Sequence, residues 1–294
     1  HPEFVRQGNL LGHNIGMYEV TNPYSHLEVR SEEDVQMASL LVTHFGASGR
    51  IEAQKLLERR AFSGTRLLGA FNEEVADWLD FFTYTCFIDR DGKYQLQMLS
   101  GSAFAPLARS MGPMLHEEAF HLGTGYSGLK RTLQAAQVPV EVVQRSLNKW
   151  VPRAFDLFGV DGSSSAHWAY VWGLKGRFDE ATAKTPADRD RLNEYARERY
   201  RWECEEIVAR LNRLLPWEIP KLYVPDLRFN RQIGEFAGKP YTIDGRLIDE
   251  VAYAEYRARV LPTPEDHALL AKISKAGDWI APKTSATGAF GSEK

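Results

Sequence analysis

The stretch Met114-Leu115-His116-Glu117-Glu118-Ala119-Phe120-His121 decides how the rest of this sequence is interpreted. An apolar stripe with helical spacing leads into it from Leu107, and Glu118 and His121 continue that stripe. A carboxylate on the buried side of a helix needs a cation or hydrogen-bond donors, because burying it unpaired costs several kcal/mol. Glu-x-x-His also places an oxygen and a nitrogen donor one turn apart, which suits a metal such as iron or manganese. Taken alone, such a pair is more often a satisfied polar pair or a solvated helix end than a metal site.

The composition is that of an ordinary soluble protein. Of the 294 residues, 44% are hydrophobic, and the net charge of -3 gives no basic excess, so nucleic acid is not expected as a partner. Cys86 and Cys204 match neither a disulfide framework nor a zinc site, which favours a reducing, cytoplasmic location. No apolar run approaches the roughly 18 residues of a membrane span, and no signal peptide is visible, so no membrane association is expected. Because the chain begins with His1 instead of Met, we expect it to be truncated at its N-terminus.

Helical periodicity predicts an all-α fold in three parts. Residues 1–30 are expected to be irregular, 31–215 to form a helical metal-binding bundle, and 216–294 to form an irregular extension packed on the bundle. Within the bundle the patterns predict helices over about 31–45, 51–60, 73–89, 107–122, 126–136, 139–158 and 191–215. Gly123-Thr124-Gly125 is expected to stop the central helix, and Ile243-Asp244-Gly245-Arg246 to form a hairpin turn.

Asp89 is the second informative residue, and it has two interpretations. Asp89-Arg90-Asp91-Gly92 is an ordinary turn sequence, but Asp89 also continues a helical apolar stripe that begins at Trp78. If the two central helices form a hairpin that turns near 101–103, Asp89 and Glu118 lie equally far from the bend, at roughly 20 Å. The hairpin therefore predicts that both carboxylates reach one level of the bundle, where they could share a metal.

Several short segments, in a fixed order, give the chain a family resemblance. They are Leu56-Leu57-Glu58-Arg59-Arg60, Gly69-Ala70-Phe71-Asn72-Glu73, Asp77-Trp78-Leu79, Asp89-Arg90-Asp91-Gly92-Lys93, Glu117-Glu118-Ala119, Gly173-Leu174-Lys175-Gly176-Arg177-Phe178, Asp244-Gly245-Arg246-Leu247-Ile248 and Trp279-Ile280-Ala281-Pro282. With these segments the chain resembles the oxygenase components of the benzoyl-CoA 2,3-epoxidase family, over nearly its whole length from about His44. Ordered segments are far more specific than Glu-x-x-His alone, so the resemblance favours the metal interpretation of Glu118 and His121.

The resemblance implies a ferritin-like bundle that holds two irons. The irons activate O2 and add one oxygen atom across a ring double bond of an aryl-CoA thioester such as benzoyl-CoA. Each half of the bundle supplies a lone carboxylate and a Glu-x-x-His pair. In the second half, Asp89 falls on the lone carboxylate, and Glu118 and His121 fall on the pair. Electrons would come from a separate reductase, since this chain has no flavin or nicotinamide fingerprint, and no protein acid or base is assigned.

The first half departs from the family pattern. Carried back without a gap from His44, the resemblance places Arg30 on the first Glu of the pair and Glu33 on its His, and the lone Glu falls near His1. The Arg30 guanidinium could lie where a second cation would sit, which would leave one metal or none. Alternatively, Glu33 is an altered ligand, or the alignment slips and Glu28 is the ligand. A solvated acidic helix start also explains these carboxylates.

The leading hypothesis is an O2-dependent non-heme di-iron oxygenase with Asp89, Glu118, His121 and Glu33 as metal ligands. The alternative is a degenerate paralogue with one metal or none, which acts on another acyl substrate or serves as a non-catalytic partner subunit. Lys175 could meet a coenzyme A phosphate, but a solvated position is favoured for it.

Overall fold

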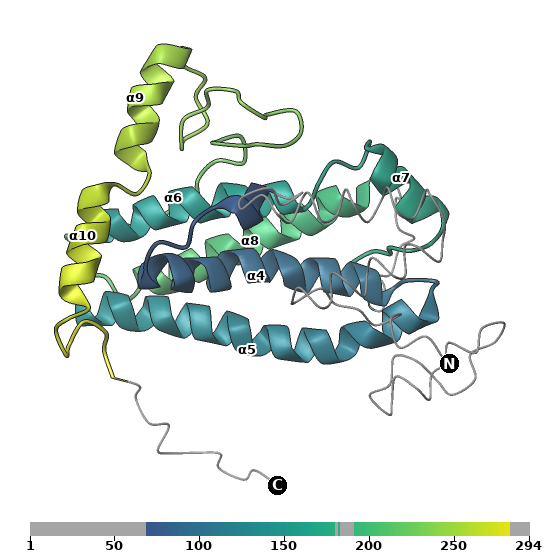
Figure 1. Cartoon of the computed structure of the whole chain (residues 1–294), viewed down its shortest axis with the longest axis horizontal. Coiled ribbons are helices and arrows are strands. Elements are labelled where there is room, and N and C mark those ends of the chain that lie inside the picture. Colours follow the sequence, from purple (N-terminus) through teal and green to yellow (C-terminus); the bar gives the residue numbers. More distant parts are fainter. Residues whose placement is uncertain (1–68, 180–181, 183–190, 283–294) are drawn as a thin grey trace, which may run out of the picture.

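The protein is an all-α helical bundle (Figure 1). The computed structural model describes residues 69–179, 182 and 191–282, and no strand occurs among them. The elements are η2 (Gly69–Asn72), α4 (Trp78–Ser100), α5 (Ala105–Ala135), α6 (Val140–Leu157), α7 (Ser164–Val171), α8 (Leu192–Asn212), α9 (Glu250–Val260) and α10 (Pro264–Ile273). The prediction of an all-α, ferritin-like bundle is confirmed for these residues, and the helices expected before residue 69 lie outside them.

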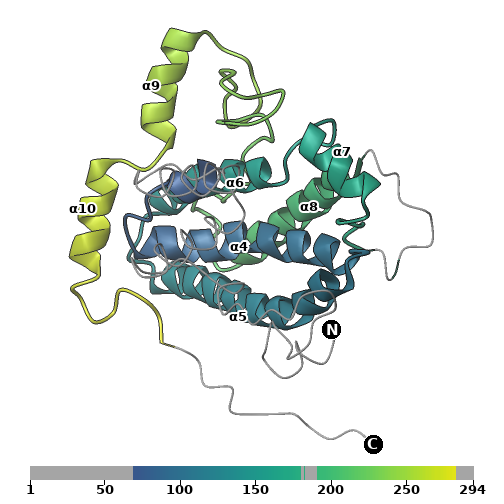
Figure 2. The ribbon, with the colours of Figure 1, turned by 45° about the vertical axis from the view of Figure 1, so that its right-hand side comes forward.

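Helices α4 and α5 form a long hairpin, and they run side by side in both views (Figures 1 and 2). Asp77 caps α4 by accepting a hydrogen bond from the N–H of Asp80 at 2.8 Å, so the helix begins at Trp78 and not at the predicted position near residue 73. The bend covers residues 101–104, as predicted, and Pro106 occupies the first turn of α5, where its missing N–H costs nothing.

The prediction that Gly123-Thr124-Gly125 stops a helix is wrong, because α5 runs without interruption to Ala135. Gly125 faces α4, where a Cβ atom would lie 2.4 Å from the backbone nitrogen of Cys86. Gly125 therefore allows the backbones of α4 and α5 to approach closely, and it does not end α5. The intimate contact fixes the position of α5 along α4.

Large apolar side chains fill the space between α4, α6 and α8. Trp150, Tyr200 and Phe87, one from each helix, are fully buried, and the Tyr200 hydroxyl donates to the Phe87 carbonyl at 2.9 Å. Asp80 of α4 is also buried and accepts a hydrogen bond from Trp150 Nε1 at 2.9 Å. Helix α4 thus contacts α5, α6 and α8, which determines the face that it turns toward α5. Of the described helices, none combines the length and apolar character needed to cross a bilayer.

The C-terminal stretch contains two helices that the sequence patterns did not predict. Its hairpin turn is confirmed: Gly245 has φ +80°, and its N–H donates to the carbonyl of Thr242 at 2.9 Å. Helix α9 projects from the bundle and buries none of its residues, whereas α10 lies across the end of α4 (Figure 2). A capping box between Thr263 and Asp266 starts α10, and this local signal could have predicted the helix.

Candidate metal centre

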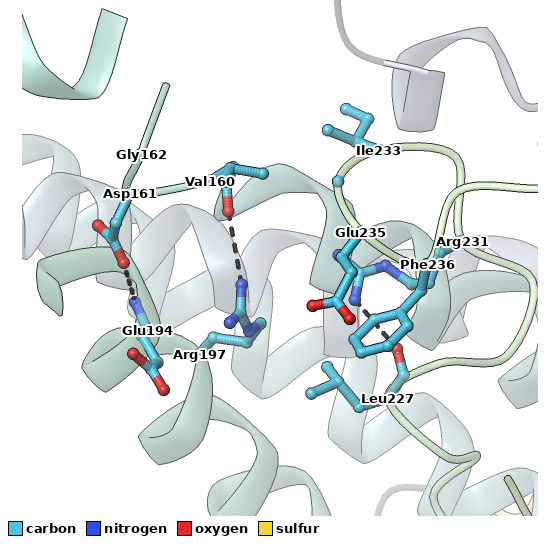
Figure 3. Close-up of a pocket in the computed structure, with 12 residues that line it drawn as sticks. Val160, Asp161, Gly162, Glu194, Arg197, Leu227, Arg231, Ile233, Glu235 and Phe236 are labelled. Carbon is cyan, nitrogen blue, oxygen red and sulfur yellow. Dashed lines mark hydrogen bonds between the residues drawn. The ribbon is translucent and has the colours of Figure 1, made fainter. Parts of the chain in front are cut away.

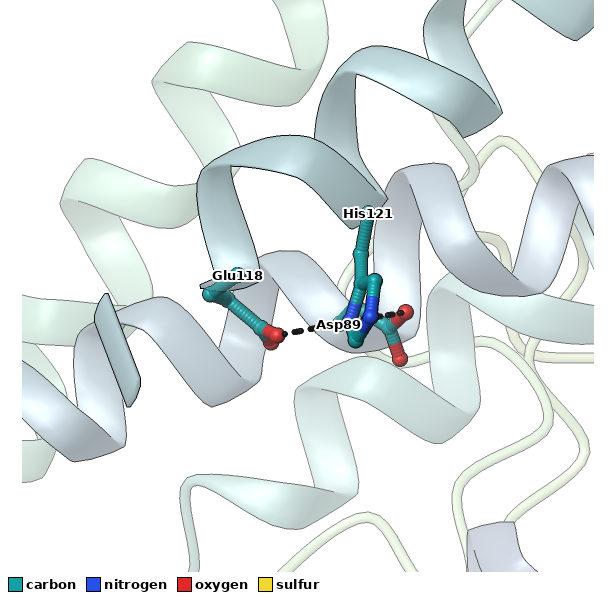
Figure 4. Close-up of side chains that lie close together, drawn as sticks. All are labelled: Asp89, Glu118 and His121. Carbon is teal, nitrogen blue, oxygen red and sulfur yellow. Dashed lines mark hydrogen bonds and ion pairs between the residues drawn. The ribbon is translucent and has the colours of Figure 1, made fainter. Parts of the chain in front are cut away.

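Three side chains with metal-ligating atoms converge between α4 and α5 (Figure 4). Asp89 comes from α4, and Glu118 and His121 come from α5; one ligand atom of each lies within 4.8 Å of the others. His121 Nδ1 is 3.2 Å from Glu118 Oε2 and 3.8 Å from Asp89 Oδ2. The structure therefore brings together three of the four ligands proposed from the sequence.

The convergence depends on α4 being helical at Asp89. The alternative interpretation of residues 89–92 as a turn is wrong, because they lie in the middle of α4. Asp89 then points toward α5, while its neighbour Arg90 points the other way, donating to Glu203 Oε1 at 2.7 Å and to the carbonyl of Cys86 at 3.0 Å. The hairpin sets Asp89 opposite Glu118, at the level where the predicted metal would lie.

Gly92 makes room for the Glu118 carboxylate, and it was not among the site residues predicted from the sequence. A Cβ atom at residue 92 would lie 2.6 Å from Glu118 Oε1. Gly92 is one turn after Asp89 on the same face of α4. Because residue 92 has no side chain, the Glu118 carboxylate of α5 can approach this face close to Asp89. Its position three residues after a candidate ligand was the available signal.

The two carboxylates are poorly compensated by the protein itself. Burial is the main cause that raises the pKa of Asp89 to about 6, and the Glu118 charge raises it further, while His121 opposes the shift. Burial likewise raises the pKa of Glu118. Among the described residues, the ion pairs of Asp89 and Glu118 are with His121, since Lys93 and Arg90 both pair with Glu203. A bound cation would supply the missing positive charge.

The donor set fits iron. Two carboxylates and one imidazole are the oxygen-rich, imidazole-supplemented ligands that suit Fe(II) and also Mn(II). Figure 4 shows the three side chains directed into the space between the two helices. His121 remains 43% exposed, whereas the side chains of Asp89 and Glu118 are 19% and 14% exposed, so the cluster is open on the His121 side. Asp89, Glu118 and His121 could thus hold one iron with coordination positions left open.

The proposed first-half ligands are not placed. Glu33 lies outside the described residues, as do Arg30, Glu28, His44 and His1. Glu33 therefore remains a prediction from the sequence, and so do the alternatives in which Arg30 replaces a metal or Glu28 is the ligand.

Lys175 is not on a solvated face, so that preference was wrong. Its Nζ donates to Gln95 Oε1 and to Asn193 Oδ1, each at 2.8 Å, and burial lowers its pKa to about 8. Gln95 in turn donates to the fully buried Asp91, whose pKa burial raises to about 7. This network ties the segment after α7 to the inner face of α4, and it uses two of the three N–H donors of Lys175.

A mainly apolar groove of about 530 Å³ lies along α5. The groove is lined by Phe82, Ala119, Phe120, Gly123, Thr124, Ser127, Gly128 and Arg131. It begins next to Glu118 and His121 in the sequence of α5 and ends at Arg131, whose Nε donates to the carbonyl of Ala281 at 2.5 Å. The helix that supplies two of the candidate ligands therefore also lines a space that could receive an apolar group.

Comparisons with known proteins agree with the resemblance seen in the sequence. Residues 37–182 match the family described as phenylacetic acid catabolic protein. The chain is also similar to benzoyl-CoA oxygenase component B of Aromatoleum evansii, with 34% identity over an alignment of 339 residues that covers 95% of this chain and 71% of the relative. Because that alignment is longer than this chain of 294 residues, the relative has internal segments without a counterpart here. The register of any first-half ligand depends on where those segments fall.

Proposed function

We propose that this chain, which belongs to the family of benzoyl-CoA oxygenase component B, is the oxygenase component of an O2-dependent enzyme acting on an aryl-CoA thioester. The observation that carries the proposal is the convergence of Asp89, Glu118 and His121 on facing helices. A ligand cluster of this composition in a ferritin-like bundle supports an iron centre, and the relative's name supports an oxygenase acting on benzoyl-CoA.

Each part of the site has a role in this proposal. Asp89, Glu118 and His121 hold iron, which when bound supplies the electron-transfer chemistry that O2 activation requires. The α5 groove receives the aromatic ring, because Phe82 and Phe120 offer apolar surface within one or two turns of the ligands. The reaction inserts one oxygen atom across a ring double bond and releases the other as water. It therefore consumes two electrons, which a separate reductase component delivers at the expense of its own donor, and two protons from the solvent.

The metal stoichiometry separates the active enzyme from a degenerate relative. Plasma mass spectrometry would measure iron and manganese per chain in the full-length protein expressed with both metals. Two irons per chain would support a di-iron centre whose further ligands come from the residues outside the described ranges, Glu33 and Glu28 being the candidates. One iron would support a centre built from Asp89, Glu118 and His121 with a first half that has lost its metal. No bound iron would contradict the proposed oxygenase and favour a non-catalytic partner subunit.

The activity itself is tested with benzoyl-CoA, O2, a reductase and its electron donor. We expect O2-dependent conversion of the thioester to a product one oxygen atom heavier, detected by mass spectrometry, with label incorporated from ¹⁸O2. A chain that carries iron but converts neither benzoyl-CoA nor ring-substituted analogues would contradict the proposed substrate class. It would not contradict the proposed metal centre.

A further inference from the structure

A second cavity contains no lining residue from α4 or α5, the two helices that carry the candidate metal ligands (Figure 3). It has a volume of about 300 Å³ and lies where three segments meet: the loop 159–162 after α6, the first turns of α8, and the loop 227–236. Its lining shares no residue with the metal cluster or with the α5 groove. Any ligand that it binds would therefore be distinct from the substrate proposed above. We call this cavity the Arg197 pocket.

Arg197 of α8 has no carboxylate in ion-pair contact within the described part of the chain. The Nε atom of Arg197 is buried and has no hydrogen-bond partner among the described residues. The Nη1 atom of the same side chain donates to the Gly159 carbonyl, but this hydrogen bond is long at 3.4 Å. Burial is the main cause that lowers the pKa of Arg197, the nearby Arg231 guanidinium adds to the effect, and the charges of Asp161, Glu194 and Glu198 oppose it. Figure 3 shows the Arg197 side chain reaching between the 159–162 and 227–236 loops. An anion entering this space would give the buried Nε a hydrogen-bond acceptor and add direct compensation to a partly desolvated charge.

Arg231, in contrast, is already neutralised. Its Nε donates to Asp156 Oδ1 at 2.6 Å, and its other nitrogens donate to the carbonyls of Leu227 and Phe155. Arg231 is thus part of the pocket wall, and Arg197 is the guanidinium left to meet a ligand.

The acidic side chains around the pocket limit the charge of the ligand. Asp161 is engaged by the N–H groups of Asn193 and Glu194, each at 2.9 Å, and by the Tyr170 hydroxyl at 2.7 Å. The Glu194 carboxylate accepts from Arg191 Nε at 2.7 Å, and the exposed Glu235 lies at the rim. These carboxylates would repel a dianion such as a phosphate more strongly than a monoanion, so the pocket favours a ligand with a single negative charge.

The remaining wall of the pocket is apolar. Val160, Leu227, Ile233 and Phe236 line it, and Phe236 offers an aromatic face. We propose that the Arg197 pocket binds a small monocarboxylate with an apolar body, such as an aromatic acid, with the carboxylate on Arg197 and the body against Leu227 and Phe236. A planar guanidinium binds a carboxylate through two parallel hydrogen bonds, which gives both affinity and orientation.

The test is calorimetric titration of the full-length protein with benzoate, benzamide and inorganic phosphate. Benzamide has the shape of benzoate without its charge, and we expect it to bind at least tenfold more weakly; phosphate should also bind more weakly. The Arg197→Met variant should lose about 10- to 100-fold in benzoate affinity, because a charge-assisted hydrogen bond is removed. Arg210→Met, which removes an exposed arginine from the same helix, is the matched control and should bind benzoate as the wild type does.

A carboxylate can also ligate a metal, so the titrations are repeated with His121→Ala. Unchanged benzoate binding in that variant would support the Arg197 pocket, and lost binding would place benzoate at the metal centre and overturn the proposal. The proposal also fails if Arg197→Met, shown by circular dichroism to be folded, binds benzoate as tightly as the wild type. Equal affinities for benzoate and benzamide, or no benzoate binding up to its solubility limit, would overturn it as well.

Discussion

Gly92 of α4 lies directly beneath the Glu118 carboxylate of α5, so close that a Cβ atom at residue 92 would stand 2.6 Å from Glu118 Oε1. This contact ties the backbone of one helix to the ligand orientation of the other. Because the Glu118 carboxylate also faces His121 at 3.2 Å, any displacement at residue 92 changes the geometry of the whole cluster. The relation makes the candidate metal centre sensitive to a residue that carries no ligand atom.

We expect Gly92→Ala to weaken iron binding by about 10- to 100-fold, the usual effect of disturbing a residue that orients a ligand. The fold should survive, since alanine favours a helix over glycine by about 0.5–1 kcal/mol. Iron titration of the metal-free protein measures the effect. Gly112→Ala is the matched control: its Cβ would meet nothing within 4 Å, so it should bind iron normally. Equal iron affinities in the two variants would show that Gly92 does not position Glu118.

Asp89→Ala and Glu118→Ala should each abolish iron binding, because each removes one of three protein ligands from the cluster. The measurement is iron per chain by plasma mass spectrometry. His116→Ala and Glu117→Ala remove an exposed imidazole and an exposed carboxylate from the same helix, and both should retain the wild-type iron content. A wild-type iron content in Asp89→Ala or Glu118→Ala would contradict the proposed metal site.

Removing the Asp89 charge should stabilise the metal-free protein at neutral pH. Burial and the Glu118 charge raise the folded-state pKa of Asp89 to about 6 from its ordinary 3.8, so the folded protein binds the proton more tightly than the unfolded chain does. The folded state is thus penalised above pH 6, the penalty shrinks as pH falls toward 3.8, and it vanishes below that value.

Asp89→Asn is therefore expected to be more stable than the wild type at pH 7, by about 1–2 kcal/mol after allowance for solvent screening. The advantage should decline on acidification to pH 4. Urea unfolding of both metal-free proteins across this range measures the difference. An advantage that stays constant with pH would mean that Asp89 does not titrate in this window.

Gly125→Ala should destabilise the protein, because the added Cβ would lie 2.4 Å from the backbone nitrogen of Cys86, which cannot move aside as a side chain can. Overpacking of this kind costs about 1–3 kcal/mol. Gly123→Ala, two residues away on α5, meets nothing within 4 Å and should be stabilised by about 0.5–1 kcal/mol. Thermal or urea unfolding compares them, and a Gly125→Ala protein as stable as Gly123→Ala would contradict the close contact of α4 with α5.

Filling the α5 groove should impair substrate use without affecting the metal. Gly123 lines the groove, and its Cβ direction is unobstructed, so Gly123→Leu places a side chain in the space proposed for the aromatic ring. We expect iron content to stay at the wild-type level and the KM for benzoyl-CoA to rise about tenfold, the loss of roughly 1.4 kcal/mol of binding. Gly112→Leu, also on α5 but outside the groove, is the control. Normal kinetics in Gly123→Leu would place the ring elsewhere.

The helical character of the bundle follows from local patterns in the chain. Apolar periodicity predicted α4, α6 and α8, because each helix buries one stripe of side chains whichever partner it meets. Glu-x-x-His also set Glu118 and His121 one turn apart, which is a local property of any helix.

The geometry of the candidate metal centre depends on which helix packs against which, and no local pattern specifies this. The sequence of residues 89–92 fits a turn as well as a helix, and packing of α4 against three other helices selected the helix and aimed Asp89 at Glu118. The glycines near residue 125 signalled a helix end locally, but they serve a backbone contact with Cys86 that no local pattern encodes. Lys175 was expected in solvent, and its burial beside Gln95 depends on a chain segment folding back over α4. Periodicity specifies which face of a helix is buried, whereas distances between ligands and the desolvation of charges arise only when two specific faces meet.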